Sequence, residues 1–181
     1  MHGPMLLVGD KRRKLYLFAF IGDMSRLITH AEFCLSEGLV IYLQALRQTL
    51  LKRGLPPKSY LDNSPAFRFH HLEEITASLG IVLVYSPLYV PQGQGKIERF
   101  FRVVRSQFFS DFKGYTLRDI NEALECWVRD FYHQRKHLGT GQPPGNALQA
   151  RWSASGRPTP IWKTTSEKGP RAAWPGTAPS P

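Results

Sequence analysis

The chain has 181 residues, enough for one domain of ordinary size followed by a short tail. Its 24 lysines and arginines outnumber its 14 acidic residues, which gives a formal net charge of +10. Such an excess favours a polyanionic partner, either nucleic acid or an anionic membrane. No apolar run approaches the roughly 18 residues of a membrane span. The two cysteines, Cys34 and Cys126, exclude a disulfide framework, and we expect buried, reduced thiols in a cytoplasmic protein.

Three short apolar segments open the chain. Residues 5–8, 15–21 and 27–33 are rich in aromatic and branched side chains, and charged or glycine-containing stretches separate them. This pattern predicts three strands in an antiparallel meander. We expect Asp10 and Asp23, which lie in the two connections, to act as turn formers.

Helices and strands then alternate. A leucine repeat with a period near 3.6 predicts a helix over 36–54, and its apolar face comprises Leu39, Leu43, Leu46 and Leu50. The expected elements that follow are a strand at 58–62, a helix at 67–79, a strand at 81–85, a loop at 86–95, and helices at 96–112 and 117–132, with Thr116 as a possible N-cap of the last. The order predicts a mixed α/β fold in which three antiparallel strands and further parallel strands are flanked by helices.

We expect three parts along the chain. Residues 1–115 form the core, and residues 116–152 form a C-terminal helical extension of it. From residue 151 onward proline, glycine, serine and threonine are frequent and no periodicity is visible, so we expect residues 153–181 to be a disordered tail.

Two acidic residues occupy positions suited to a metal site. Asp62 closes a predicted strand and Glu98 lies in the first turn of a predicted helix, with 35 residues, 63–97, between them. Carboxylates from a strand end and a helix can converge on a divalent cation, since Mg²⁺ prefers oxygen ligands. Two such ions can clamp the attacking and leaving oxygens of a phosphoryl displacement. In a chain with 14 acidic residues this spacing alone does not define a site.

The residues around the acidic pair resemble a known family. The segment 60–64, Tyr-Leu-Asp-Asn-Ser, resembles the strand-Asp-Asn-Gly segment of retroviral integrases and bacterial insertion-sequence transposases. Residues 89–99 are similar to the family's Tyr-x-Pro-Gln-x-Gln-Gly-x-x-Glu-Arg segment, and residues 20–26 to its Ile-Asp-Asp-x-Ser-Arg turn. A stretch that follows the core in bacterial family members has a similar pattern of spaced residues, which here are Trp127, Tyr132, Arg135 and His137. The chain is thereby identified as a member of the DDE transposase/integrase family over roughly residues 1–152.

The resemblance implies a fold, a cofactor and an activity. The fold is RNase H-like, and the cofactor is Mg²⁺ or Mn²⁺, with two ions expected in a complete site. The family uses three carboxylates there, and the resemblance implies Asp62 and Glu98 as two of these catalytic metal ligands. The activity is metal-dependent DNA cleavage at a transposon end followed by strand transfer into target DNA. The implied partners are transposon-end and target DNA and further copies of the chain on that DNA. No membrane is involved, and the protein is cytoplasmic, associated with the nucleoid when bound to DNA.

The family's first catalytic aspartate has no counterpart in this sequence. By alignment it would precede Met1 by two residues, and Gly22 and Ser64 also depart from the usual Asp and Gly. We therefore expect the chain, as written, to be inactive alone in strand transfer. Two alternatives remain open: a non-catalytic DNA-binding or dimerising remnant of a transposase, and an unrelated basic α/β nucleic-acid-binding module.

Basic and loop residues near Glu98 are candidates for DNA contacts. Arg102 and Arg105 lie one and two turns beyond Glu98, so all three share a helix face; the alternative role for Arg102 is a helix salt bridge with Glu98. The complete DNA-binding set that we expect is Tyr89, Gln94, Lys96, Arg99, Arg102 and Arg105. His133 and His137 have the spacing of a zinc pair but lack a third ligand in sequence, so we expect no zinc there.

Overall fold

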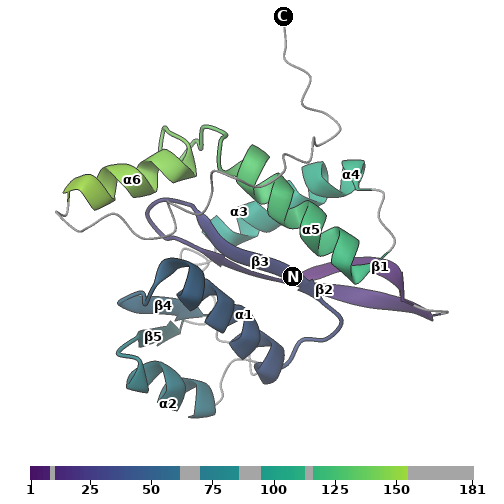
Figure 1. The fold of residues 1–181 in the computed structure, drawn as a ribbon, viewed down its shortest axis with the longest axis horizontal. Coiled ribbons are helices and arrows are strands. Elements are labelled where there is room, and N and C mark those ends of the chain that lie inside the picture. Colours follow the sequence, from purple (N-terminus) through teal and green to yellow (C-terminus); the bar gives the residue numbers. More distant parts are fainter. Residues whose placement is uncertain (9–10, 62–69, 86–94, 113–115, 155–181) are drawn as a thin grey trace, which may run out of the picture.

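The computed structural model describes residues 1–8, 11–61, 70–85, 95–112 and 116–154 (Figure 1). Residues 155–181, which include most of the expected tail, lie outside the described residues. No helix in the described parts is long and apolar enough to cross a membrane.

The first three strands form the expected antiparallel meander. Strands β1 (His2–Val8), β2 (Lys11–Ile21) and β3 (Ile28–Cys34) pair in the order β1-β2-β3. Side chains of β2 alternate between the two faces of this sheet. Leu15 and Leu17 are buried in one hydrophobic cluster, whereas Phe18 and Phe20 pack in another.

A second, parallel sheet consists of β4 (Lys58–Leu61) and β5 (Val82–Tyr85). The sequence predicts one mixed sheet, but among the described residues the two sheets share no strand pairing. Side chains join them instead, because Leu61 and Leu83 pack with Phe18 and Phe20 around Tyr42. Helix α1 (Leu39–Arg53) supplies Tyr42, and α2 (His70–Ser78) lies beside β5 (Figure 1).

The leucine repeat of α1 faces this second cluster as expected, although the helix begins at Leu39 rather than Ser36. It ends at Gly54, whose φ of 79° lies in the left-handed region and whose N–H donates to the Leu50 carbonyl at 2.8 Å.

The second half of the chain is helical. The helix expected at 96–112 is present as α3 (Gly95–Val103), a π-helical turn η3 (Val104–Phe108) and α4 (Phe109–Asp111). The next is α5 (Leu117–Trp127) followed by a second π turn, η4 (Val128–Tyr132). Thr116 caps α5 as expected: its hydroxyl accepts from the Asp119 N–H at 3.1 Å, and the Asp119 carboxylate accepts from the Thr116 N–H at 3.0 Å. Helix α6 (Pro144–Ala154) was not expected, and it continues past residue 151, where the sequence shows no periodicity.

These elements form layers around the antiparallel sheet (Figure 1). Helices α3 and α5 cover one face and α1 covers the other. The larger hydrophobic cluster lies between the sheet and α3–α5, and it includes residues on both sides of residue 115. Its buried members are Leu15, Leu17, Ile28, Phe33, Phe100, Val104, Phe108, Ile120, Leu124, Trp127, Val128 and Tyr132.

Candidate metal centre and nucleic-acid interface

Packing of α3 on the sheet determines where Glu98 points. Phe100 and Val104 are fully buried against the antiparallel sheet. Glu98 lies in the first turn and is exposed. Among the described residues no basic group lies within 4 Å of its carboxylate. Its oxygens are therefore not committed to an ion pair in this part of the chain, and carboxylate oxygens are ligands that hard cations prefer.

The second expected metal ligand follows β4 directly. Leu61, the last residue of that strand, is 8% exposed and belongs to the cluster around Tyr42. Asp62 itself lies outside the described residues, as do Tyr89 and Gln94. The structure thus describes the strand that leads to Asp62 and the helix that carries Glu98, and their convergence remains a prediction.

The described residues contain no group of three histidine, cysteine or acidic side chains that could hold a metal ion. The chemistry of the two expected ligands nevertheless fits a hard divalent cation, because both are carboxylates and Glu98 is exposed and unpaired with any described basic side chain.

Arg102 and Arg105 extend from Glu98 along the exposed side of the same helix. In the described parts of the chain neither arginine has a carboxylate within 4 Å, so the alternative salt bridge between Arg102 and Glu98 is not formed. Both guanidinium groups therefore present their hydrogen-bond donors to solvent, as phosphate-binding arginines do.

Lys96 and Arg99 differ in their surroundings. Lys96 is half-buried, and its ammonium group forms an ion pair with Asp23 in the β2–β3 turn. Asp23 therefore does more than form a turn, because it attaches that turn to the start of α3. Arg99 is exposed, and none of the carboxylates that the structure describes lies within 4 Å of it.

The end of η4 contributes residues whose roles were not evident from sequence. The His133 Nε2 atom accepts a hydrogen bond from the Ile28 N–H at 3.0 Å, which connects η4 to the start of β3. Burial lowers the pKa of His133 to about 4, and the charge of Arg53 acts in the same direction. His133 is thus a neutral structural acceptor near pH 7, a role that the sequence does not predict.

Tyr132 lies beside His133 in the core. Its ring meets the Phe100 ring edge-on at 5.1 Å and lies 6.4 Å from the His137 ring. Burial raises the pKa of Tyr132 to about 12, while the positive charges of Arg26 and Arg99 oppose that shift. The sequence segments 20–26, 98–99 and 132–137 therefore meet around one buried tyrosine.

The two cysteines are free but only half-buried. Burial, with a smaller contribution from Glu32, raises the pKa of Cys34 to about 12, so this thiol stays protonated near pH 7.

Comparison with solved structures identifies the fold. The chain is similar to a chain in the structure of the simian T-cell lymphotropic virus intasome in complex with the PP2A regulatory subunit B56 gamma (TM-score 0.63, 18% identity, 81% of this chain and 51% of that chain). It is also similar to the BIV integrase catalytic core (TM-score 0.59, 22% identity, 77% and 89%). The HTLV-2 integrase core, solved with magnesium, matches with a TM-score of 0.58 at 18% identity over 81% and 90% of the two chains. The fold is that of an integrase catalytic core, with its RNase H-like α/β layers.

Comparison with known sequences also finds similarity to integrase and transposase proteins. Residues 79–144 match the integrase core domain. The transposase of transposon Tn552 from Staphylococcus aureus is 32% identical over 113 residues, which are 56% of this chain and 23% of that transposase. This chain therefore spans about a quarter of the length of that transposase.

Proposed function

We propose that the chain serves in DNA transposition as the part of a transposase catalytic core that carries Asp62 and Glu98. The complete enzyme would cleave DNA and transfer its strands, and this part of the core would not do so alone. The observation that carries the proposal is the arrangement on α3 and η3, where exposed Glu98 and Arg102 of α3 are followed by exposed Arg105 of η3 on an integrase-core fold. A carboxylate for a metal and two cations for phosphate on one helix face suit a reaction at a phosphodiester.

Asp62 and Glu98 are the proposed ligands for Mg²⁺ or Mn²⁺. Bound there, the metal would supply charge neutralisation at the reacting phosphate. Arg102 and Arg105 would hold neighbouring phosphates and orient the DNA strand along α3. Arg99, Tyr89 and Gln94 are proposed to contact the same DNA, whereas Lys96 would first have to exchange its partner Asp23 for a phosphate.

DNA and further copies of the chain are the proposed partners. The net charge of +10 favours a polyanion. One of the similar structures is that of a viral intasome, and the HTLV-2 core was solved in a trimeric and in a dimeric form. For this chain we propose assembly on DNA.

The experiment is duplex-DNA binding measured over a range of salt concentrations. Replacing both Arg102 and Arg105 by alanine is expected to lower the slope of log K against log salt by about 1.8, because each lost phosphate contact accounts for about 0.9. Affinity should fall to a similar extent for unrelated duplex sequences, since phosphate contacts carry no base readout.

The matched control replaces two arginines that already pair with carboxylates. Arg118 contacts Glu122 at 2.6 Å, and Arg129 contacts Asp130 at 2.8 Å. The Arg118→Ala/Arg129→Ala variant removes the same formal charge and should leave the salt slope close to that of the parent chain. Equal slopes for the parent and the Arg102/Arg105 variant would contradict the assignment of α3 as the DNA-binding face.

A further inference from the structure

The turn between β2 and β3 holds an arginine in an unfavourable backbone conformation. Arg26 has a φ of 63°, and it is the one non-glycine residue with positive φ among the described residues. The turn is closed by hydrogen bonds from the Arg26 N–H to the Gly22 carbonyl (2.9 Å) and from the Gly22 N–H to the Leu27 carbonyl (2.8 Å). Left-handed strain in a residue with a Cβ atom is concentrated at functional sites, because surrounding structure must maintain it.

The side chain of Arg26 has an unmet hydrogen-bonding requirement. Arg26 is half-buried, and its Nη1 atom is buried without a hydrogen-bond partner in the described structure. Buried polar atoms are nearly always paired, and charged ones lose most when they are not. An anionic acceptor would meet the requirement of this guanidinium group.

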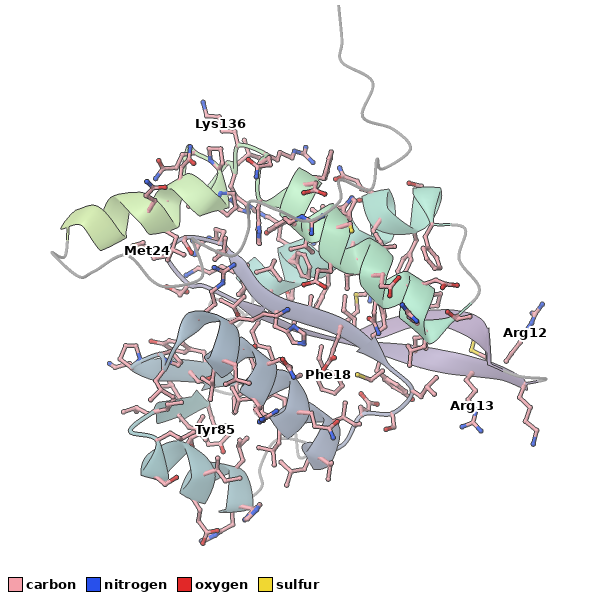
Figure 2. The ribbon with its side chains drawn as sticks, in the orientation of Figure 1. Arg12, Arg13, Phe18, Met24, Tyr85 and Lys136 are labelled. Carbon is pink, nitrogen blue, oxygen red and sulfur yellow. The ribbon has the colours of Figure 1, made fainter. Side chains whose placement is uncertain are left out.

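Two contacts determine what lies around Arg26. The ion pair of Asp23 with Lys96 holds the β2–β3 turn against the start of α3, and the bond from Ile28 to His133 holds it against the end of η4. Figure 2 shows Met24, in this turn, and Lys136 at the same end of the molecule, away from Arg12 and Arg13 at the tip of the β1–β2 hairpin. Arg26 is thereby placed between the first turns of α3 and the segment after η4.

Two further cations act on the same residues as Arg26, because Arg99 lowers the pKa of Tyr132 and of His137, and Arg135 lowers that of His137. Arg99 and Arg135 are exposed, and neither has a carboxylate within 4 Å among the residues that the structure describes. Arg135 donates from Nη1 to a neutral acceptor, the Gln107 Oε1 atom, at 3.0 Å, so its charge is not compensated there.

His137 faces these cations from the end of the cluster. Its Nδ1 atom accepts from the Gly139 N–H at 3.3 Å, which leaves Nε2 as the protonated nitrogen and a donor. Burial lowers the pKa of His137, and the charges of Arg26, Arg99 and Arg135 lower it further. The ring therefore lies in a positive field that a bound anion would reverse.

We propose that Arg26, Arg99, Arg135 and His137 bind one phosphate group. The identity of its source rests on the proposed function: the phosphate belongs to the backbone of DNA that also follows Arg102 and Arg105. Donors from the β2–β3 turn, α3 and the segment after η4 approach from different directions, which suits a tetrahedral phosphate, and arginine forks bind its oxygens in pairs. The cluster would hold the DNA strand near the start of α3, whereas Arg105 in η3 would contact it further along.

The test is an NMR titration of the His137 ring, with its signal assigned by loss in His137→Gln. The probes are a short DNA duplex at low salt and, separately, inorganic phosphate. A phosphate seated beside the ring should raise the His137 pKa by about one unit or more. Arg26→Gln should abolish that rise and weaken duplex binding about tenfold. Arg135→Gln, at an exposed position, provides a second variant with the same expected direction.

The control is Arg13→Gln at the far tip of the hairpin, which should leave the rise in His137 pKa intact. Duplex binding with an unchanged His137 pKa overturns the inference and leaves the proposed function standing. A rise with inorganic phosphate in a chain that does not bind duplex supports the phosphate site and counts against the proposed function. No rise with either probe overturns the site outright.

Discussion

His133 shows how a single buried side chain connects two distant parts of the sequence. Its Nε2 lone pair accepts the Ile28 N–H, and Ile28 begins the strand that follows the Arg26 turn. Protonation of Nε2 would break that bond and introduce a charge beside Arg53, whose own pKa burial lowers. The neutral form of His133 is therefore part of the folded structure.

We predict an acid-sensitive stability from this histidine. Its pKa is about 4 in the folded chain, against 6.5 for an ordinary histidine. Between these values the unfolded chain binds more protons, so the contribution is complete above pH 6.5 and is lost as the pH falls toward 4. The loss amounts to at most about 3 kcal/mol.

Urea unfolding at a series of pH values measures this effect. His133→Gln should flatten the fall in the free energy of unfolding between pH 6.5 and pH 4, because it removes the titrating group. His71→Gln, at an exposed position on α2, is the matched reference. A pH profile identical in the parent and His133→Gln would refute the assignment.

At the scale of elements, one asparagine attaches α5 to the sheet. Asn121 accepts from the Phe33 N–H at 2.7 Å and donates to the Phe33 carbonyl at 3.0 Å, so it pairs both backbone groups on the outer edge of β3. The rest of the contact is apolar, with Ile120 and Leu124 packed in the same cluster as Phe33.

Removal of that side chain should therefore cost more than an ordinary surface substitution. Asn121→Ala leaves the Phe33 N–H and carbonyl without their partner, and we expect a loss of about 2 kcal/mol in the free energy of unfolding. Thermal or urea unfolding measures it, with Glu122→Ala at the adjacent exposed position of α5 as control. An equally small loss in the free energy of unfolding in both variants would show that β3 does not depend on the two hydrogen bonds from Asn121.

Local patterns predicted most of these elements and missed particular ones for physical reasons. Apolar runs predicted the strands. Thr116 predicted the start of α5, because a capping box depends only on residues close together in the sequence. The π turns η3 and η4 were not predicted, since π-helical turns are rare and occur mostly as single turns within α-helices. Helix α6 contains few apolar residues in periodic positions, so its sequence offers little beyond Pro144 in the first turn.

At the scale of the whole molecule, the family resemblance predicted the fold correctly, whereas the site that it implies at Asp62 and Glu98 stays a prediction. Glu98, Arg102 and Arg105 lie on the exposed face as their spacing predicts. Roles that depend on contacts between distant segments were not predictable, and these include the ion pair of Asp23 with Lys96 and the bond between Ile28 and His133. Helical spacing is set by local geometry, whereas such contacts are set by how the layers pack.

We propose that Asp62 and Glu98 together bind one divalent metal between β4 and α3. The most direct test is titration of the 181-residue chain with Mn²⁺ while the backbone amide signals are followed by NMR, because a paramagnetic ion broadens only nearby nuclei. We predict that Mn²⁺ broadens the amides of Leu61 and Arg99 together. We also predict that Asp62→Asn and Glu98→Gln each abolish the effect and that Glu125→Gln, on α5, does not. Broadening at only one of the two segments, or broadening that persists in Glu98→Gln, would contradict the shared metal site.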